Sequence, residues 1–220
     1  MPTPTAEAAS RAPLTREQIL RAALVQVDQA GLDGLSMHKL GARLGVKAMS
    51  LYNHVDGKDG LLDGLVDLLW SDMGASKALD GDWREALRRL ARTVRDTLRR
   101  HPSAAPLMMS RPVLPVGALR VFRAHLDGLE AAGFSRGRAV EVVRAVASYA
   151  FGAALSELCW SCAAAATESD LARLRRVSQR LPDDVPQDLL AVAMEICGDC
   201  DLEAPFELGL DLMLRGLEPG

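Results

Sequence analysis

Apolar residues recur along most of the chain at spacings of three and four positions, which is the repeat of one face of an α-helix. Apolar and polar residues alternate only over short runs, so the pattern does not predict a sheet. The spacing predicts a helix over 15–30, two short helices between 36 and 54, and a longer helix from 58 to 74. A linker is expected over 74–82, where the pattern weakens. The fold class is therefore predicted to be all-α.

The rest of the chain repeats the helical spacing in longer segments. Residues 83–98 carry an apolar stripe, with arginines on the other face. A proline-rich stretch over 102–115 leaves room for at most one short helix. The segment 135–160 is apolar on nearly every side, so this helix should be buried from more than one direction. Further helices are expected over 116–132, 168–181, 188–196 and 206–217.

Four residues are placed to begin or end the first helices. Thr15 and Ser36 are suited to N-cap positions, where a side-chain hydroxyl accepts a hydrogen bond from a free backbone N–H. Gly31 and Gly45 each follow a helical pattern, and glycine readily takes the left-handed conformation that ends a helix. Residues 36–54 are therefore expected to form a helix, a tight turn and a second helix.

Composition narrows the class of protein. Of the 220 residues, 49% are hydrophobic and 25% are charged, which is typical of a soluble globular protein and excludes disordered, collagen-like and disulfide-scaffold classes. The longest apolar run, 145–155, is shorter than the roughly 20 residues that cross a bilayer, so no membrane span is expected. The N-terminus lacks the features of a signal peptide, so we expect a cytoplasmic protein with reduced cysteines.

The segment 35–55 carries the clearest candidate for function. Two helices of about seven residues each would bury four apolar residues on one side, namely Leu40, Leu44, Val46 and Leu51. The polar residues of the second helix would face outward and match the base edges of a DNA major groove: Lys47, Ser50, Tyr52, Asn53 and His54. His38 and Lys58 flank this helix and are candidates for phosphate contacts.

Charge supports this interpretation weakly. The net charge of the chain is −3, so DNA binding would have to rest on a local surface. Between Arg11 and Gly60 there are seven Lys and Arg against five Asp and Glu, a local balance of +2. A helix pair of this kind is also a common way to pack three short helices without any role in DNA binding.

About fifty residues of the N-terminal part resemble the DNA-binding domain of the TetR family of bacterial transcriptional regulators. The matching motifs are Ala22-Ala23-Leu24, Gly34-Leu35-Ser36, Leu40-Gly41, Leu44-Gly45-Val46, Ser50-Leu51-Tyr52, His54-Val55 and Leu61-Leu62. The resemblance implies a homodimer whose two recognition helices enter successive major grooves of a pseudo-palindromic operator. It places operator contacts at Met37, His38, Ala48, Met49, Ser50, Tyr52, Asn53, His54 and Lys58. Ala48-Met49 replaces a Gln-Pro pair of the tetracycline repressor, which removes a bidentate adenine reader and favours contact with thymine methyl groups.

The C-terminal part resembles the ligand domain of the tetracycline-repressor type over Phe206-Glu207-Leu208-Gly209-Leu210-Asp211, followed by Leu214 and Gly216-Leu217. The resemblance implies a larger helical domain with the dimer interface and a pocket for a small-molecule effector, which releases the repressor from DNA. By analogy, the pocket would be lined by Leu65, Trp70, Val94, Leu98, His101, Met108, Met109, Phe122, His125, Leu126, Val143 and Phe151. For any one of these residues, a plain core position is favoured over contact with a ligand.

His101 and His125 are the sharper pocket candidates, because an imidazole in an apolar cleft can hydrogen-bond a ligand. A lone histidine is also often satisfied by the backbone or by solvent. The metal-assisted recognition of the tetracycline repressor is not expected here, because its full set of ligands is not identifiable in this sequence.

These interpretations divide the chain into four parts. Residues 1–13 are expected to be a disordered arm, 14–60 a helix-turn-helix DNA-binding domain, 61–80 a connecting helix and linker, and 81–220 the ligand-binding and dimerisation domain.

Two charged segments of opposite sign lie far apart in the C-terminal part. Seven arginines occur between Arg84 and Arg100, and seven acids between Glu195 and Glu218. They would either pair, within or between subunits, or stand as solvated faces. Because exposed ion pairs contribute little, solvated faces are the favoured prediction.

All four cysteines fall into two Cys-x-x-Cys pairs, Cys159 with Cys162 and Cys197 with Cys200. Two such pairs can supply a tetrahedral thiolate site for structural zinc, if the end of helix 135–160 lies beside the start of the last helix. The 34-residue spacer is longer than usual for such sites. A thiol switch and inert burial remain as alternatives. No cofactor is required by the predicted function.

Two other classes of function are less well supported. An enzyme is not expected, because the chain has no Gly-rich phosphate loop, nucleophile elbow or acidic metal cluster. A helical protein-interaction adaptor would leave the polar surface at Lys47, Ser50, Tyr52 and Asn53 without a role. Salt-dependent binding to DNA separates the adaptor from the regulator.

Overall fold

The fold was analysed in a computed structural model, which describes residues 13–74, 82–111, 114–160, 170–179, 181–182, 184–197 and 202–219. These residues form α-helices and contain no strand, which confirms the all-α prediction. The helices are α1 (Arg16–Ala30), α2 (Met37–Leu44), α3 (Ala48–Leu51), α4 (Gly57–Gly74), α5 (Trp83–Arg100), α6 (Ala105–Ser110), α7 (Val116–Ala131), α8 (Arg136–Trp160), α9 (Asp170–Ser178), α10 (Gln187–Cys197) and α11 (Glu203–Arg215).

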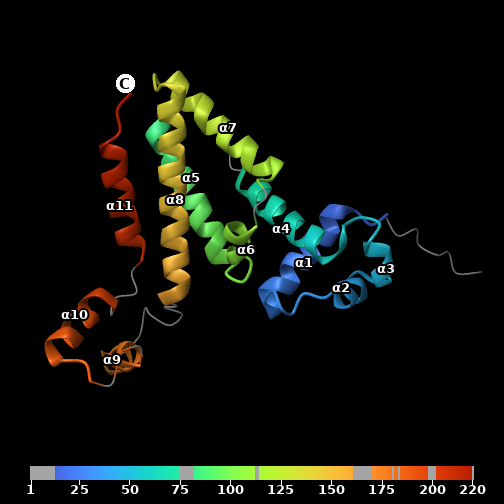
Figure 1. Cartoon of the computed structure of the whole chain (residues 1–220), viewed down its shortest axis with the longest axis horizontal. Helices are drawn as coiled ribbons and strands as arrows, with labels where there is room; N and C mark the ends of the chain where they lie inside the picture. The colour runs from blue at the N-terminus through green and yellow to red at the C-terminus, as the bar shows by residue number, and fades with distance from the viewer. Residues whose placement is uncertain are drawn as a thin grey trace, which may run out of the picture.

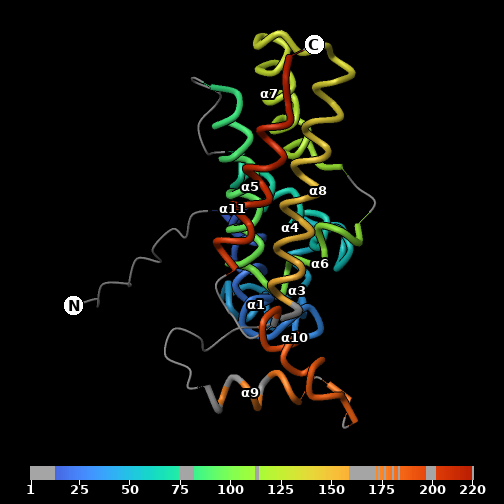
Figure 2. Tube along the Cα trace, turned by 90° about the vertical axis from the view of Figure 1, so that its left-hand side faces the viewer, coloured from blue at the N-terminus to red at the C-terminus, as the bar shows by residue number. Residues whose placement is uncertain are grey.

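The chain forms a small N-terminal head and a larger body, which are joined by α4 (Figure 1). We call residues 13–60 the head and the described residues from 82 onward the body. The long helices α5, α8 and α11 run side by side in the body, and the turned view in Figure 2 shows the same arrangement. Helix α4 packs against α1 at one end and against α7 at the other. It is therefore the main covalent and packing link between head and body.

Local sequence signals account for the start of the head. Thr15 caps α1 in a reciprocal capping box, in which its hydroxyl accepts from Gln18 N and the Gln18 side chain accepts from Thr15 N. Gly31 ends α1 with a positive φ of 70°, but its ψ of 175° lies outside the left-handed helical conformation that was predicted. Ser36 stands at the N-cap of α2, but its side chain makes no capping hydrogen bond, so this part of the capping prediction is wrong.

A close approach between α1 and α4 fixes the base of the head. A side chain at position 64 would place its Cβ 2.5 Å from the Leu20 side chain, so only glycine allows the two helices to pack so closely. The neighbouring apolar residues Ile19, Leu61 and Leu65 are fully buried. The first half of α4 is therefore part of the head's core.

Helix α8 is covered by α5, α7 and α11, which confirms the prediction that it is buried from several directions. Among the described helices, it alone has the length and hydropathy to cross a bilayer, a property that it shares with core helices of soluble proteins. Its outer face stays exposed at Gly137, Ala145, Ser148 and Gly152.

The arginines of α5 pair with acids of α11, so the prediction of solvated faces is wrong. Arg92 donates to both carboxylate oxygens of Glu207 at 2.7 and 2.8 Å, and Arg88 pairs with Asp211. The hydrogen bond from Arg92 lowers the pKa of Glu207. The physical reason for the difference is tertiary: α11 packs along α5, which brings residues more than a hundred positions apart into contact.

Arg95 is the most deeply placed of these arginines. It is 1% exposed and lies over the Phe206 ring, 4.4 Å from the ring centroid. Its guanidinium bonds Glu157 of α8 at 2.6 Å, Glu203 of α11 at 2.5 Å and the Leu202 carbonyl oxygen at 3.0 Å. Burial on its own would lower the pKa of Arg95, but the bonds to the two carboxylates more than offset it. Arg95 thus holds the end of α8 beside the start of α11.

Candidate DNA-binding and effector sites

The helix-turn-helix of the head is closely packed at its turn. Gly45 adopts the left-handed conformation and donates its N–H to the carbonyls that end α2, as predicted. A Cβ at Gly41 would stand 2.9 Å from the Val46 carbonyl oxygen and 3.0 Å from Ala48 N. Glycine at position 41 therefore lets α2 lie directly against the start of α3.

The second helix of the motif is shorter than predicted. Helix α3 spans Ala48–Leu51, and Tyr52 to His54 form turns instead of a further helical turn. Leu51 is fully buried and anchors α3 to the core of the head. Most of the predicted DNA contacts nevertheless lie on or beside α3.

The predicted contact residues are mostly accessible. The exposed ones are His38, Lys47, Met49, Tyr52, Asn53 and Lys58. The half-buried ones are Met37, Ala48, Ser50 and His54, and Met37 packs against the core. Met49 is 74% exposed and Tyr52 is 48% exposed, so both large side chains are accessible to a partner. Lys39, which the sequence analysis did not single out, is also exposed in α2 next to His38.

An aromatic cluster joins three helices, α4, α7 and α8. The Trp70 ring of α4 lies 5.1 Å from the Phe122 ring of α7 and 5.9 Å from the Phe151 ring of α8, measured between centroids. All three were predicted to line the effector pocket. Of the other predicted pocket residues, four are fully or nearly fully buried and two pack against the same core: Leu65, Val94, Leu98, Val143, Met108 and Leu126.

The remaining predicted pocket residues have different surroundings. The Nδ1 atom of His125 lies 2.8 Å from the Val121 carbonyl oxygen. Burial lowers the pKa of His125, although its backbone contacts act in the opposite direction, so the imidazole is neutral near pH 7. His101 contacts the head instead, with its Nδ1 atom 2.9 Å from Asp28 Oδ2 of α1. Met109 is 57% exposed at the end of α6.

Comparison with known families decides the identity of this arrangement. The family described as "Bacterial regulatory proteins, tetR family" matches residues 19–65, and "Tetracyclin repressor-like, C-terminal domain" matches residues 75–219, which is more than half of the chain. The chain belongs to the TetR family. It is a ligand-responsive, DNA-binding transcriptional repressor with an N-terminal helix-turn-helix domain and a helical C-terminal domain.

Individual TetR-family relatives cover different shares of the chain. The repressor DrrR1 of Streptomyces coeruleorubidus is 35% identical over 151 residues, which are 66% of this chain and 54% of that protein, so the match spans about half of DrrR1. The class A tetracycline repressor of Escherichia coli is 31% identical over 202 residues, 90% of this chain and 88% of the relative. A solved structure of a possible TetR family regulator from Streptomyces coelicolor A3(2) has a TM-score of 0.72 at 27% identity, and covers 91% of this chain and 97% of that chain.

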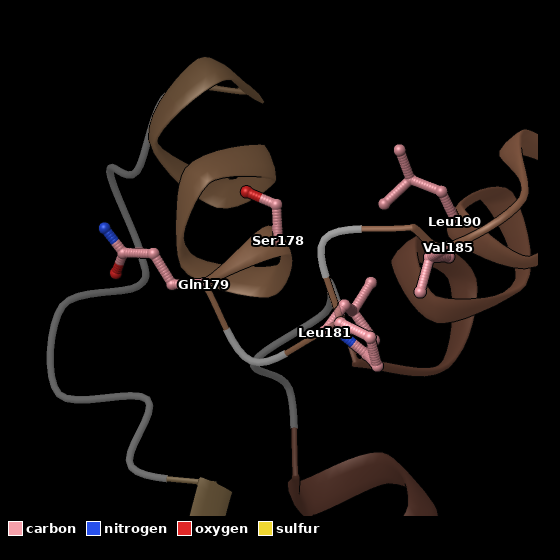
Figure 3. Close-up of a pocket in the computed structure, with 6 residues that line it drawn as sticks. Ser178, Gln179, Leu181, Val185 and Leu190 are labelled. Atoms are coloured by element: carbon pink, nitrogen blue, oxygen red, sulfur yellow. The ribbon is translucent and has the colours of Figure 1, made fainter.

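One pocket of this TetR-family protein lies away from the aromatic cluster. It has a volume of about 380 Å³ between α9 and α10 and is lined by Ser178, Gln179, Leu181, Pro182, Val185 and Leu190 (Figure 3). None of the twelve residues predicted to line the effector pocket lines this one.

The four cysteines lie outside the residues whose side chains the structure describes. The zinc prediction therefore stays a prediction. The described residues next to the two pairs are close together, however, because Arg95 bonds both Glu157 and Leu202. Among the described residues, no three His, Cys, Asp or Glu side chains form a group that could hold a metal ion.

Proposed function

We propose that this regulator binds a pseudo-palindromic operator as a homodimer in the cytoplasm, and that a small-molecule effector releases it from DNA. The observation that carries the proposal is the accessible surface of α3, where two large side chains and several polar ones stand in solvent on a firmly packed helix-turn-helix. Such a surface fits a major groove, which admits one helix and offers both thymine methyl groups and hydrogen-bonding base edges. We propose a role in regulation and none in catalysis.

The proposed dimer uses the outer faces of α8 and α11. Leu208 and Leu212 are 62% and 63% exposed on α11, one helical turn apart. Exposed large apolar residues that adjoin one another mark interaction surfaces in soluble proteins. The exposed residues of α8 include the small Ala145, Ser148 and Gly152, which allow close approach of a second helix pair, and the charged Glu141 and Arg144 lie near them.

Contacts within the protomer hold α8 and α11 together at this proposed dimer face. The Tyr149 hydroxyl of α8 donates to the Phe206 carbonyl oxygen of α11 at 2.8 Å. A Cβ at Gly209 would stand 2.3 Å from that hydroxyl oxygen, so the two helices are in close contact at this point. Two copies of the α8–α11 pair would then form a four-helix interface with two-fold symmetry.

The proposed division of roles at the operator follows side-chain chemistry. Met49 and Tyr52 would contact thymine methyl groups, and Ser50 and Asn53 would hydrogen-bond base edges. Met37, Ala48 and His54 would complete the surface from half-buried positions. The cationic or hydrogen-bonding residues at the margin would contact phosphates, namely His38, Lys47 and Lys58.

Tyr52→Ala tests this surface. We expect the variant to bind the operator more weakly by about 1–3 kcal/mol, because one good base contact is lost. The operator would first be selected from a pool of random duplexes with the wild-type protein, and affinities would be measured by gel shift across a salt series. Leu119→Ala removes a side chain that is 49% exposed on α7 of the body and serves as the control. Unchanged affinity of Tyr52→Ala would remove Tyr52 from the contact surface, and failure to select any duplex would contradict the proposed function.

The proposed effector site is the region around Trp70, Phe122 and Phe151. Three aromatic rings from three helices give an apolar environment with edge-on and tilted ring faces, which suits a flat, multi-ring ligand. The tetracycline repressor of Escherichia coli, to which this chain is similar, is named for a ligand of that shape.

A second proposal concerns the two Cys-x-x-Cys pairs, which we propose to hold a structural zinc ion. It is supported by Arg95, which ties Glu157, two residues before Cys159, to Leu202, two residues after Cys200. Four thiolates that are brought together would bind zinc tetrahedrally. A thiol switch is the alternative that the test below separates.

Cys162→Ser is expected to lower zinc content and melting temperature together, because a four-thiolate site loses one ligand. Native mass spectrometry of the reduced wild-type protein reports subunit number, bound metal and co-purified ligand in one measurement. One zinc per subunit in the wild type, and less in the variant, supports the proposal. A metal-free dimer under reducing conditions contradicts zinc and favours the thiol switch or inert burial.

A further inference from the structure

Helix α6 is tied to the head at both of its ends. Before it, His101 contacts Asp28 of α1, and the side chains of this pair are 20% and 28% exposed. After it, Arg111 reaches the head end of α4. The short helix therefore links the body to two different helices of the head (Figure 1).

Arg111 makes three bonds to the first two turns of α4. Its Nε atom donates to Asp63 Oδ1 at 2.6 Å, and its two Nη atoms donate to Asp59 Oδ1 and to the Asp59 carbonyl oxygen, each at 3.2 Å. Because these bonds reach both side chains and the backbone of α4, they fix the orientation of the Arg111 guanidinium as well as its distance from the helix. The contact lies a few residues after Val55, whose buried side chain closes the helix-turn-helix.

A third aspartate, Asp67, continues the same row along α4. Gly117 N, at the start of α7, donates to Asp67 Oδ1 at 3.3 Å. Asp59, Asp63 and Asp67 are spaced four apart, so they lie on one face of α4 and all meet the segment that joins α6 to α7. The orientation of α4, and of the head that it carries, is set along this row.

We propose that the Arg111 contacts with Asp59 and Asp63, together with the His101–Asp28 contact, set the spacing of half-sites that the dimer accepts. The inference rests on the proposed dimeric operator recognition. In a two-fold dimer, the angle between head and body fixes the separation of the two α3 surfaces. Arg111 and His101 are then positioning residues: they touch no base, yet they determine which operators fit.

The geometry of DNA makes spacing a sensitive readout. One added base pair moves a half-site by about 3.4 Å along the duplex and turns it by about 35° around the axis. A rigidly held head cannot follow both changes, whereas a loosely held head can. Partly exposed ion pairs contribute little to overall stability, so their removal leaves the fold intact while loosening the angle.

The experiment is a spacing scan with the full-length protein. The selected operator is made as a series in which the half-sites are moved apart or together by one or two base pairs. We expect the wild type to lose about 10-fold in affinity per base pair of displacement, comparable with one mismatched pair, and Arg111→Gln to lose less than about 3-fold. Asp28→Asn should broaden the profile in the same direction, and Arg111→Lys should keep much of the wild-type profile.

Arg123→Gln is the matched control, because its ion-pair partner among the described residues is Asp127 of the same helix, at 3.6 Å, and its side chain is 82% exposed. Circular dichroism checks that each variant keeps its helices. A variant profile as sharp as that of the wild type, with the same optimum, would overturn the inference while leaving the proposed function in place. Absence of wild-type binding to any two-half-site duplex would overturn both.

Discussion

Leu212→Asp is expected to separate the proposed dimer and to weaken operator binding by about 10²–10⁴-fold, because the second half-site is then no longer bound intramolecularly. Leu212 is 63% exposed in the single chain, so the substitution does not disturb the core of the protomer. In the dimer, the substitution would bury two aspartate carboxylates, one from each subunit, among four helices and without ion-pair partners. Native mass spectrometry measures the subunit number, and gel shift measures affinity for the selected operator.

The matched control for this prediction is Leu119→Asp. Leu119 is 49% exposed on α7, away from the α8–α11 face, so this variant should stay dimeric with unchanged affinity. The far-ultraviolet circular dichroism of both variants should match that of the wild type. A dimeric Leu212→Asp variant with wild-type affinity would show that assembly uses another surface.

Arg95→Met is expected to lower the free energy of unfolding by about 3–5 kcal/mol, the range found when one partner of a buried ion pair is removed. Glu157 is only 9% exposed at its side chain, and no described residue gives its Oε2 atom a hydrogen bond. Without Arg95, this carboxylate would stay buried, and the remaining cation beside it among the described residues would be the more distant Arg99 guanidinium, at 3.5 Å. Urea unfolding with detection by circular dichroism measures the loss.

Two further variants make this prediction specific. Arg92→Met removes an arginine one turn away whose side chain is 44% exposed, and should cost only about 0–1 kcal/mol. The double variant Arg95→Met with Glu157→Leu should recover most of the lost stability, because an apolar pair replaces the buried charges. Equal losses for Arg92→Met and Arg95→Met would contradict the distinction between the two sites.

Much of the fold could be predicted from local signals. The 3.6-residue repeat located all the long helices to within a few residues, since each buries one stripe against neighbours. Thr15 begins α1 through its side-chain cap, and Gly45 ends α2 in the left-handed conformation. The candidate DNA surface was also predictable, because Leu51 and the residues beside it alternate between the core and solvent within one short segment.

Other features could not be predicted because they depend on which helices become neighbours. The helical spacing and the positive charge of the α5 arginines are visible in the sequence. Nothing local in the sequence indicates that α11 lies beside them. The same applies to His101, which the sequence places with the pocket residues and the structure brings to Asp28 in α1. The length of α3 was overestimated, because the polar residues after Leu51 suit turns as well as a helix.

The ion pairs of α5 have a consequence for how the protein meets a polyanion. By local charge, α5 is the most basic stretch of the chain, and alone it would attract phosphates without regard to sequence. Five of its seven arginines, Arg84, Arg88, Arg92, Arg95 and Arg99, are instead engaged by groups of α8 or the C-terminal segment. The charges of these arginines are offset by neighbouring carboxylates, so α5 attracts a duplex less than its own sequence indicates.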